Sequence, residues 1–323
     1  MKQILGIGNA LVDVLIQISS DEILNELELP KGSMQLIDKD RFLSINERIR
    51  DYKKSKVAGG SSANTMAGLA RLGNQCGFIA KTGPDENGEV FYNDMKTCGV
   101  NPSLLRSNTP TGTALTFISP DGERTFGTFL GAAAELDAAE LHAEMFSGYD
   151  LFYIEGYLVQ NHALIEKAVS LAKSLGLKIA IDLASYNVVE SNLEFLSHLI
   201  KNYANIVFAN EEEAKAFTGK NPHDSLEYLA EISDVAIVKI GAEGSLIKDK
   251  NKVVAVDAFP AKPIDTTGAG DLYAAGFLHG FVNQLPLNTC GEYGSLLAGN
   301  VVEVIGTKMS DDRWNSIFEQ VKK

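Results

Sequence analysis

The chain has 323 residues, of which 45% are hydrophobic and 22% charged, as in ordinary globular enzymes. Its net charge is −13 at pH 7, which argues against general binding to nucleic acid or to an anionic membrane. The three cysteines form no Cys-x-x-Cys pair and the five histidines lack ligand spacing, so we predict neither a disulfide framework nor a structural metal.

The first half of the chain mixes strands and helices without a regular rhythm. We predict a buried strand at 3–8, a turn at 9–13, β pieces at 14–18 and 33–37 around a helix at 21–27, an exposed helix at 38–54, a helix at 65–72, a strand at 77–81 and a helix at 85–98. Two β runs at 114–119 and 124–129 flank Pro120-Asp121-Gly122, a hairpin signal.

From residue 137 onward, helices and strands alternate. We predict helices at 137–145, 162–175, 188–202, 210–217, 268–283, 288–305 and 311–321, and β segments at 150–155, 178–182, 205–209, 235–240, 245–248 and 252–256. This alternation predicts an α/β fold whose central sheet is mainly parallel, with helices on both faces.

The β-rich segments at about 14–37 and 112–130 do not fit the alternation. We place them together as a small β-sheet lid over the carboxyl ends of the central strands, where open α/β sheets bind ligands. The whole chain, 1–323, is then one domain with a lid. The start of the sequence has no signal-peptide pattern and no apolar run is long enough to span a membrane, so we expect a cytoplasmic protein.

Asp265-Thr-Thr-Gly268-Ala269-Gly270-Asp271 is the most informative stretch, because it opens a helix with small residues. The first N–H groups of a helix have no intrahelical partner and suit a phosphate. Asp271 would repel that phosphate unless it takes a proton from an attacking hydroxyl. The simpler alternative is that Asp271 caps a helix after a glycine turn.

The run from Asp265 to Leu278 resembles the carboxyl-terminal signature of the PfkB family, the ribokinase-like carbohydrate and nucleoside kinases. The resemblance covers residues from about 4 to 308. It implies a ribokinase-like fold and transfer of the ATP γ-phosphoryl group to a primary hydroxyl. Asp271 would be the base, and the N–H groups of Gly268, Ala269 and Gly270 would stabilise charge on the transferring group.

Asn210 and Glu213 follow a predicted strand and allow two interpretations. Their spacing is that of a helix capping box. It also resembles the Asn-x-x-Glu motif of the PfkB family, which implies a role with Mg²⁺ held through water. Both interpretations can hold together.

Asn9 and Asp13 follow the first buried strand. Gly6-x-Gly8 lacks the third glycine of a dinucleotide fingerprint, since Leu11 stands in its place. An amide and a carboxylate at this position can hydrogen-bond a vicinal diol. The alternative is that Asp13 caps a turn.

Gly59, Gly60 and Asn64 form a second glycine motif before a helix. By itself it predicts a tight turn and an N-cap. It is also similar to the amino-terminal family motif, in the form found in adenosine kinases, which implies contacts with the sugar end of the substrate. In the same comparison Gln35 is implied to lie near the base, and Arg124 to reach the transferring phosphate when the lid closes.

The nucleotide-binding residues rest on the family resemblance. It implies that Lys239, Gly241 and Gly244 border the ATP adenine and ribose, although a strand-to-strand turn explains these glycines equally well. Asn300 would reach the nucleotide base. Thr267 and Asp265 lie where some family members bind a monovalent cation such as K⁺.

These observations predict an ATP- and Mg²⁺-dependent kinase of a small molecule, with adenosine as the first candidate substrate and AMP as product. A sugar such as ribose or fructose, or another nucleoside, is the alternative. A catalytically silent nucleoside sensor is a third class, against which the intact Asp271 argues. A purine pocket would need aromatic faces, for which Phe126, Phe129, Tyr153 and Tyr157 are candidates. The sequence leaves monomer and homodimer both open.

Overall fold

The structure, a computed structural model, describes residues 2–321. Its strands are β1 (Gln3–Ile7), β2 (Leu11–Gln17), β3 (Met34–Leu36), β4 (Lys54–Gly59), β5 (Gln75–Thr82), β6 (Val100–Arg106), β7 (Gly112–Ile118), β8 (Arg124–Phe129), β9 (Leu151–Glu155), β10 (Lys178–Asp182), β11 (Ile206–Asn210), β12 (Val235–Lys239), β13 (Ser245–Asp249) and β14 (Val253–Val256). Its α-helices are α1 (Glu22–Glu26), α2 (Lys39–Arg48), α3 (Ser61–Arg71), α4 (Glu86–Thr97), α5 (His162–Ser174), α6 (Tyr186–Ser191), α7 (Leu193–Tyr203), α8 (Glu211–Thr218), α9 (Pro222–Ile232), α10 (Ala269–Val282), α11 (Leu287–Val301) and α12 (Asp311–Val321). Short 3-10 helices are η1 (Gly131–Glu135), η2 (Ala138–Glu140), η3 (Ala143–Phe146), η4 (Gly156–Gln160) and η5 (Gly241–Glu243).

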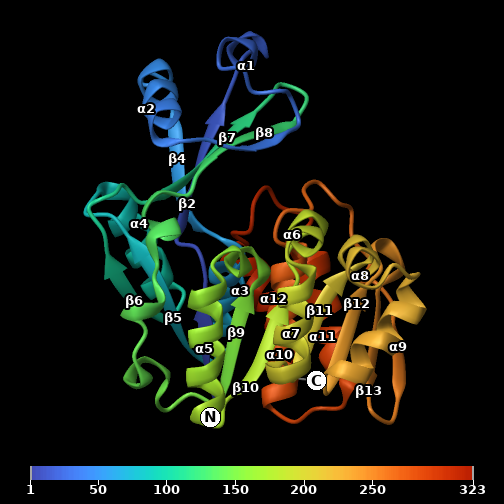
Figure 1. Ribbon diagram of the computed structural model, residues 1–323. Coiled ribbons are helices and arrows are strands. Elements are labelled where there is room, and N and C mark those ends of the chain that lie inside the picture. The colour runs from blue at the N-terminus through green and yellow to red at the C-terminus, as the bar shows by residue number, and fades with distance from the viewer. Residues whose placement is uncertain (1, 322–323) are drawn as a thin grey trace.

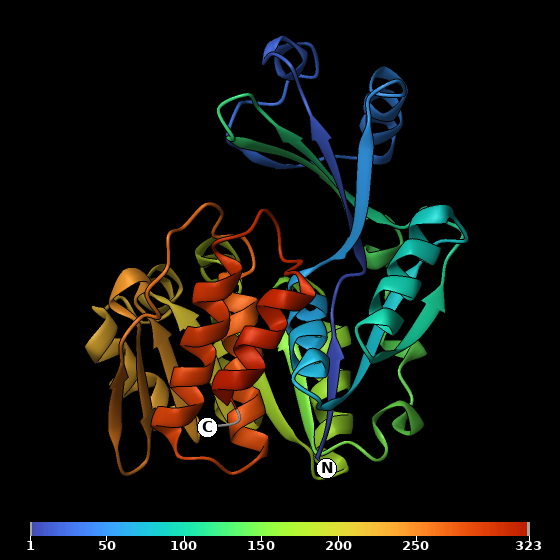
Figure 2. The same cartoon turned by 180° about the vertical axis from the view of Figure 1, so that it is seen from behind.

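Nine of the strands within residues 2–321 form one large sheet, in the order β14-β13-β12-β11-β10-β9-β1-β5-β6. Neighbouring strands from β12 to β6 are parallel, and β13 and β14 are added antiparallel at one edge. Helices cover both faces (Figures 1 and 2), which confirms the predicted α/β fold. The strand order reverses at β1, and such a reversal leaves a crevice at the carboxyl ends of the strands.

Alternate side chains of the central strands face two separate hydrophobic cores. In β1, Ile4 belongs to the core shared with α3, α10 and α11, whereas Leu5 belongs to the core shared with α5, α7 and α9. Tyr153 and Phe152 of β9 divide in the same way. Because these strands are apolar on both faces, polar side chains gather where the strands end.

A second sheet, here called the small sheet, has the strand order β3-β8-β7-β2-β4. It stands over the carboxyl ends of the central strands (Figures 1 and 2). Residues 14–37 and 112–130 contribute to it as predicted. The predicted helix at 38–54 was wrong at its end, because α2 stops at Arg48 and residues 54–59 form β4. This strand pairs antiparallel with β2, a long-range partner that the local pattern does not indicate.

The predicted helix at 137–145 is also wrong. The capping box of Asp137 and Glu140 forms, but it caps only η2. The chain then becomes extended at Leu141, which is buried in the core, and η3 follows. Burial of Leu141 therefore ends the turn that the capping residues begin.

Other element boundaries differ from those predicted. The helix at 188–202 is interrupted at Asn192, whose Nδ2 donates to the carbonyl oxygen of Val188 at 2.9 Å and so competes with the backbone. The helix expected from residue 65 begins at Ser61. Strand β6 and helix α9 were not predicted.

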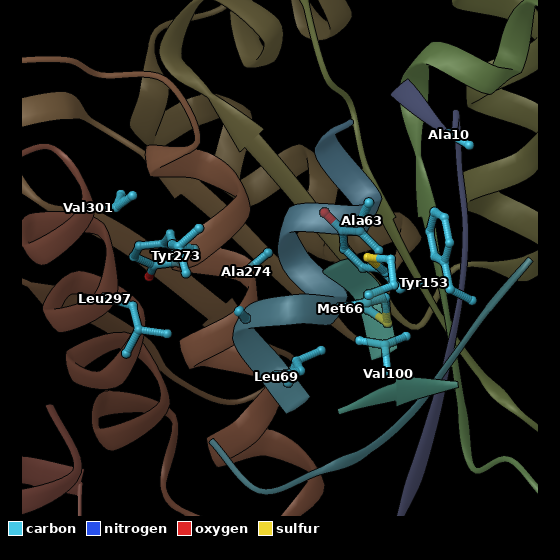
Figure 3. Close-up of a cluster of buried hydrophobic side chains, with 14 of the residues drawn as sticks. Ala10, Ala63, Met66, Leu69, Val100, Tyr153, Tyr273, Ala274, Leu297 and Val301 are labelled. Carbon is cyan, nitrogen blue, oxygen red and sulfur yellow. The ribbon is translucent and has the colours of Figure 1, made fainter. Parts of the chain in front are cut away.

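Helix α3 packs closely against α10. Figure 3 shows Ala63, Met66 and Leu69 of α3 among side chains from the strands and from α10. A Cβ on Gly68 would lie 2.9 Å from the Cβ of Ala275, so the helices meet where α3 has no side chain. This contact brings the first turns of the two helices together at the crevice.

The packing of α10 on α11 predicts a large cost for a single methyl group. A Cβ on Gly276 would lie 2.2 Å from the carbonyl oxygen of Tyr293, and a backbone atom cannot move aside. We expect Gly276→Ala to lower the free energy of unfolding by about 2 kcal/mol, although alanine favours a helix by about 1 kcal/mol. Urea denaturation measures the change. Asn288→Ala, on the exposed face of α11, is the control and should stay within about 0.5 kcal/mol of wild type. An unchanged Gly276→Ala midpoint would contradict this helix contact.

Candidate active site

A cavity of about 1710 Å³ lies between the carboxyl ends of the central strands and the small sheet. Its lining includes most of the predicted site residues: Asn9, Asp13, Gly60, Asn64, Arg124, Asn210, Glu213, Lys239, Gly241, Gly244, Thr267, Gly268, Ala269, Gly270 and Asp271. A single small-ligand pocket usually has roughly 300–1,000 Å³. The cavity therefore has room for two ligands side by side.

Asp271 lies in the first turn of α10 and is held by α3. Ser61 Oγ donates to Asp271 Oδ1 at 2.6 Å, and Asn64 Nδ2 donates to Oδ2 at 2.9 Å. Burial raises the pKa of Asp271 to about 6, against the lowering effect of these two hydrogen bonds. A carboxylate in this range is ionised at neutral pH and able to accept a proton.

The start of α10 is shaped by its glycines. Gly268 has a φ of 76°, and a Cβ there would lie 2.3 Å from Cγ2 of Thr307. Gly270 lines the same part of the cavity. The N–H of Ala269, expected to join the two glycines in binding an anion, donates to the carbonyl oxygen of Thr266 at 3.2 Å. It therefore already closes the turn that opens the helix.

Glu155 is a cavity residue that sequence reasoning missed. It ends β9 and accepts hydrogen bonds from N and Nδ2 of Asn9, at 2.9 and 2.7 Å, and from N of Ser62 at 2.7 Å. Burial raises the pKa of Glu155 to about 7, although these hydrogen bonds lower it. Glu155 thus ties the loop after β1 to the start of α3. The sequence did contain a signal for Glu155, because a carboxylate at the end of an otherwise apolar strand points to a site at that end.

Asp13 lies in β2, so the predicted turn at 9–13 ends earlier than expected. A Cβ on Gly59 would lie 2.6 Å from Oδ2 of Asp13, and one on Gly60, whose φ is 100°, would lie 2.4 Å from the carbonyl oxygen of Asn9. Both positions need glycine for that reason. Gly59 contacts Asp13 and is not part of the cavity lining. Burial raises the pKa of Asp13 to about 6, opposed by the charge of Arg124.

Lys239 and Asp182 form a buried ion pair at the ends of β12 and β10. Lys239 Nζ lies 3.1 Å from Asp182 Oδ2, and both residues line the cavity. The pKa of Lys239 is raised, because the attraction of Asp182 and Glu213 outweighs the opposite effect of burial. Asp182 was not predicted, although it ends an apolar strand as Glu155 does.

Asn210 and Glu213 form the predicted capping box. Asn210 Oδ1 accepts from Glu213 N at 2.8 Å, while Glu213 Oε2 and Oε1 accept from N and Nδ2 of Asn210, each at 2.7 Å. Burial raises the pKa of Glu213, against the effect of Lys239. No group of three His, Cys, Asp or Glu within residues 2–321 could hold a metal. This donor set suits Mg²⁺ held through water better than a direct protein cage.

Gly241 and Gly244 border the cavity at the turn between β12 and β13. Their φ values are 55° and 99°, and a Cβ on Gly244 would lie 2.0 Å from the carbonyl oxygen of Val256. The turn is therefore too close to β14 for a side chain at residue 244. This geometry is compatible both with the predicted turn and with a ligand that lies close to the backbone.

Arg124 connects the small sheet to the loop before α10. Its Nη1 lies 2.8 Å from Oδ2 of Asp265, while its Nη2 is buried and has no hydrogen-bond partner in the described part of the chain. Asp265 also accepts from N of Thr267 at 3.0 Å and from N of Gly306 at 2.6 Å. The carboxylate suggested for a monovalent cation is thus paired with a guanidinium group.

Two of the predicted contact residues, Gln35 and Asn300, lie outside the cavity lining. Gln35 lies in β3 between Met34 and Leu36, which both line the cavity, and alternation along the strand turns Gln35 away. Asn300 also lies outside the lining. Its Nδ2 donates to the carbonyl oxygen of Leu296 at 2.9 Å, so its side-chain amide bonds the backbone of its own helix, α11.

The small sheet presents an apolar face to the cavity. Met34 and Leu36, each 58% exposed, lie there with Phe126. Of the other aromatic candidates, Tyr157 lines the cavity, whereas Phe129 stacks on Phe42 and Tyr153 lies in the core.

Among the helices described within residues 2–321, none has the length and apolar character that crossing a membrane requires.

Comparisons with known proteins agree with this architecture. A family model described as pfkB family carbohydrate kinase matches residues 32–313. A probable sugar kinase from Rhizobium etli CFN 42 is 30% identical, with a TM-score of 0.87 over 99% of this chain and 98% of that one. An adenosine kinase from Sinorhizobium meliloti is 32% identical, with a TM-score of 0.86 over 99% of each chain. A nucleoside kinase from Methanocaldococcus jannaschii is 28% identical over 285 residues, which are 88% of this chain and 92% of that protein.

The family match covers most of the chain, from β3 to the start of α12, and includes the start of α10. It agrees with the expectation drawn from residues 265–278 alone. The chain belongs to the pfkB family of carbohydrate kinases and is a phosphotransferase that acts on an alcohol.

Proposed function

We propose that the protein transfers the γ-phosphoryl group of ATP to the primary hydroxyl of adenosine, giving AMP. The observation that carries this choice is the apolar face of the small sheet. Met34, Leu36 and Phe126 offer an apolar surface to a planar purine, and a small polar sugar would bury less apolar area on it. The likeness to an adenosine kinase supports the same choice, and the likeness to a probable sugar kinase supplies the alternative.

In this proposal the ribose of adenosine binds below the small sheet. The Asp13 carboxylate accepts hydrogen bonds from the ribose diol, and Asn9 contributes its side-chain oxygen, since its Nδ2 is used on Glu155. Gly60 lets the backbone approach the sugar. Asn64 holds Asp271 and thereby orients the base towards the primary hydroxyl.

Asp271 is the proposed general base. As the bond from the acceptor oxygen to the γ-phosphorus forms, the hydroxyl proton passes to the Asp271 carboxylate. The N–H groups of Gly268 and Gly270 face the developing charge, and Arg124 supplies a further donor through its unpartnered Nη2. The N–H of Ala269 contributes less, because it donates within its own turn.

The phosphoryl donor lies at the other end of the cavity. Gly241, Gly244 and Thr267 line that end and would border ATP. Asn210 and Glu213 would hold Mg²⁺ through water, and the ion would supply positive charge against the phosphate oxygens. A monovalent cation such as K⁺ at Asp265 would first require Arg124 to leave that carboxylate.

We further propose that the small sheet is the lid of a single kinase domain. Four short segments connect it to the central body, namely residues 8–10, 60, 107–111 and 130. The Arg124–Asp265 pair adds a contact between the small sheet and the loop before α10. A lid carrying Arg124 would exclude water from the transferring group as it closes.

The function is tested by ADP release from purified protein with ATP and Mg²⁺, comparing adenosine, inosine, guanosine, ribose and fructose. Adenosine should have the highest kcat/KM. Asp271→Asn should lower kcat by about 10²–10⁴-fold and leave ATP binding near wild type. Asp312→Asn, at the exposed start of α12, is the control and should keep full activity.

The possible outcomes separate the candidates. If a sugar is turned over faster than adenosine, the proposed kinase chemistry stands and the proposed purine pocket is wrong. A protein that binds adenosine and turns over no acceptor would be a sensor. Full activity of Asp271→Asn would remove Asp271 as the base.

The pKa of Asp271 predicts a particular pH dependence. Since the base must be ionised, kcat/KM for the acceptor should fall as the pH drops through about 6. Ser61→Ala removes a hydrogen bond that lowers the pKa of Asp271. The acid limb of the pH profile, where kcat/KM falls, should therefore move up by about one pH unit, the equivalent of about 1.4 kcal/mol.

Ser62→Ala is the matched control for this measurement. Ser62 Oγ is buried and makes no hydrogen bond in the described structure, so its loss should leave the acid limb in place. A Ser61→Ala profile that coincides with wild type would show that another group titrates.

A further inference from the structure

Lys239 lies closer to the start of α10 than its expected role beside the adenine and ribose implies. A Cβ on Gly270 would lie 3.1 Å from Lys239 Nζ, so the ammonium group contacts the first turn of this helix. Nζ also bonds Asp182 Oδ2 at 3.1 Å, and the Lys239 side chain is only 15% exposed. The amino group is therefore held at one point of the cavity wall.

The same turn of α10 holds Asp271, the proposed base. Asp271 is among the carboxylates whose charge raises the pKa of Lys239, together with Asp182 and Glu213. Lys239 therefore stays protonated at neutral pH. A phosphate that lies beside both Asp271 and Gly270 is the one attacked by the acceptor hydroxyl, because the base must reach that hydroxyl.

We propose that Lys239 is a catalytic residue whose ammonium group contacts the transferring γ-phosphoryl group, and that Asp182 is the residue that positions it. The proposal rests on the proposed phosphoryl transfer, but not on adenosine as the acceptor. Lys239 acts by charge and keeps its proton throughout. The bond from acceptor oxygen to γ-phosphorus forms as the bond to the bridging oxygen breaks; the hydroxyl proton goes to Asp271 and the electron pair to the β-phosphate of ADP.

The test compares Lys239→Met, which keeps the length of the side chain without its charge, with Lys239→Arg. With any acceptor that wild type phosphorylates, Lys239→Met should lower kcat by about 10²–10³-fold and change the Kd of ATP by less than about fivefold. Lys239→Arg should have a kcat at least about tenfold higher than that of Lys239→Met. Asp182→Asn should lower kcat by about tenfold with little change in KM.

Lys248→Met is the matched control. Lys248 lies on the neighbouring strand β13, pairs with Glu227 and is not part of the cavity lining. Its kcat should equal that of wild type. Thermal unfolding of all variants establishes that each is folded at the assay temperature.

A binding measurement tests the role of Lys239 without any acceptor. Aluminium fluoride with ADP and Mg²⁺ mimics the transferring phosphoryl group, and it should tighten ADP binding to wild type and to Lys248→Met, but not to folded Lys239→Met. Equal tightening in Lys239→Met would overturn the proposal, as would a raised KM for ATP with an unchanged kcat. Failure of adenosine as a substrate, with Lys239-dependent tightening intact, would reject only the choice of acceptor.

Discussion

The contact between α3 and α10 is the constraint on which the site depends. At Gly68 the helices approach so closely that a Cβ would lie 2.9 Å from Ala275. This approach lets Ser61 and Asn64 hold both oxygens of Asp271, across more than 200 positions of sequence. A carboxylate oriented from two sides needs little reorganisation to act as the proposed base, and such pre-organisation is a large part of enzymatic rate enhancement.

An excess of negative charge is the second feature of the cavity. Carboxylates end β9 and β10 and open α8 and α10. The basic side chains that line the cavity are Lys56, Arg124, Lys239 and Lys308. Burial and mutual repulsion raise the pKa values of Glu155, Glu213 and Asp271 as a result. A polyphosphate adds further negative charge, which explains why a phosphoryl donor would bring Mg²⁺ and why each protein cation in this region matters.

Local patterns predicted features that depend on residues near one another in sequence. The alternating strands and helices, the capping box of Asn210 and Glu213, and the glycine-opened helix at 268 are confirmed. Predictions failed where a distant partner decides the structure. Residues 54–59, for example, become a strand because β2 pairs with them.

The sequence by itself determined the fold class, the kinase family and the position of the candidate base, because short-range periodicity and a contiguous motif encode them. Only the tertiary structure decided which polar side chains meet. Glu155 and Asp182 end strands far apart in sequence, yet parallel pairing brings them to one edge of the sheet beside Asn9 and Lys239. Contacts of this kind follow from strand order and helix packing, neither of which a local pattern contains.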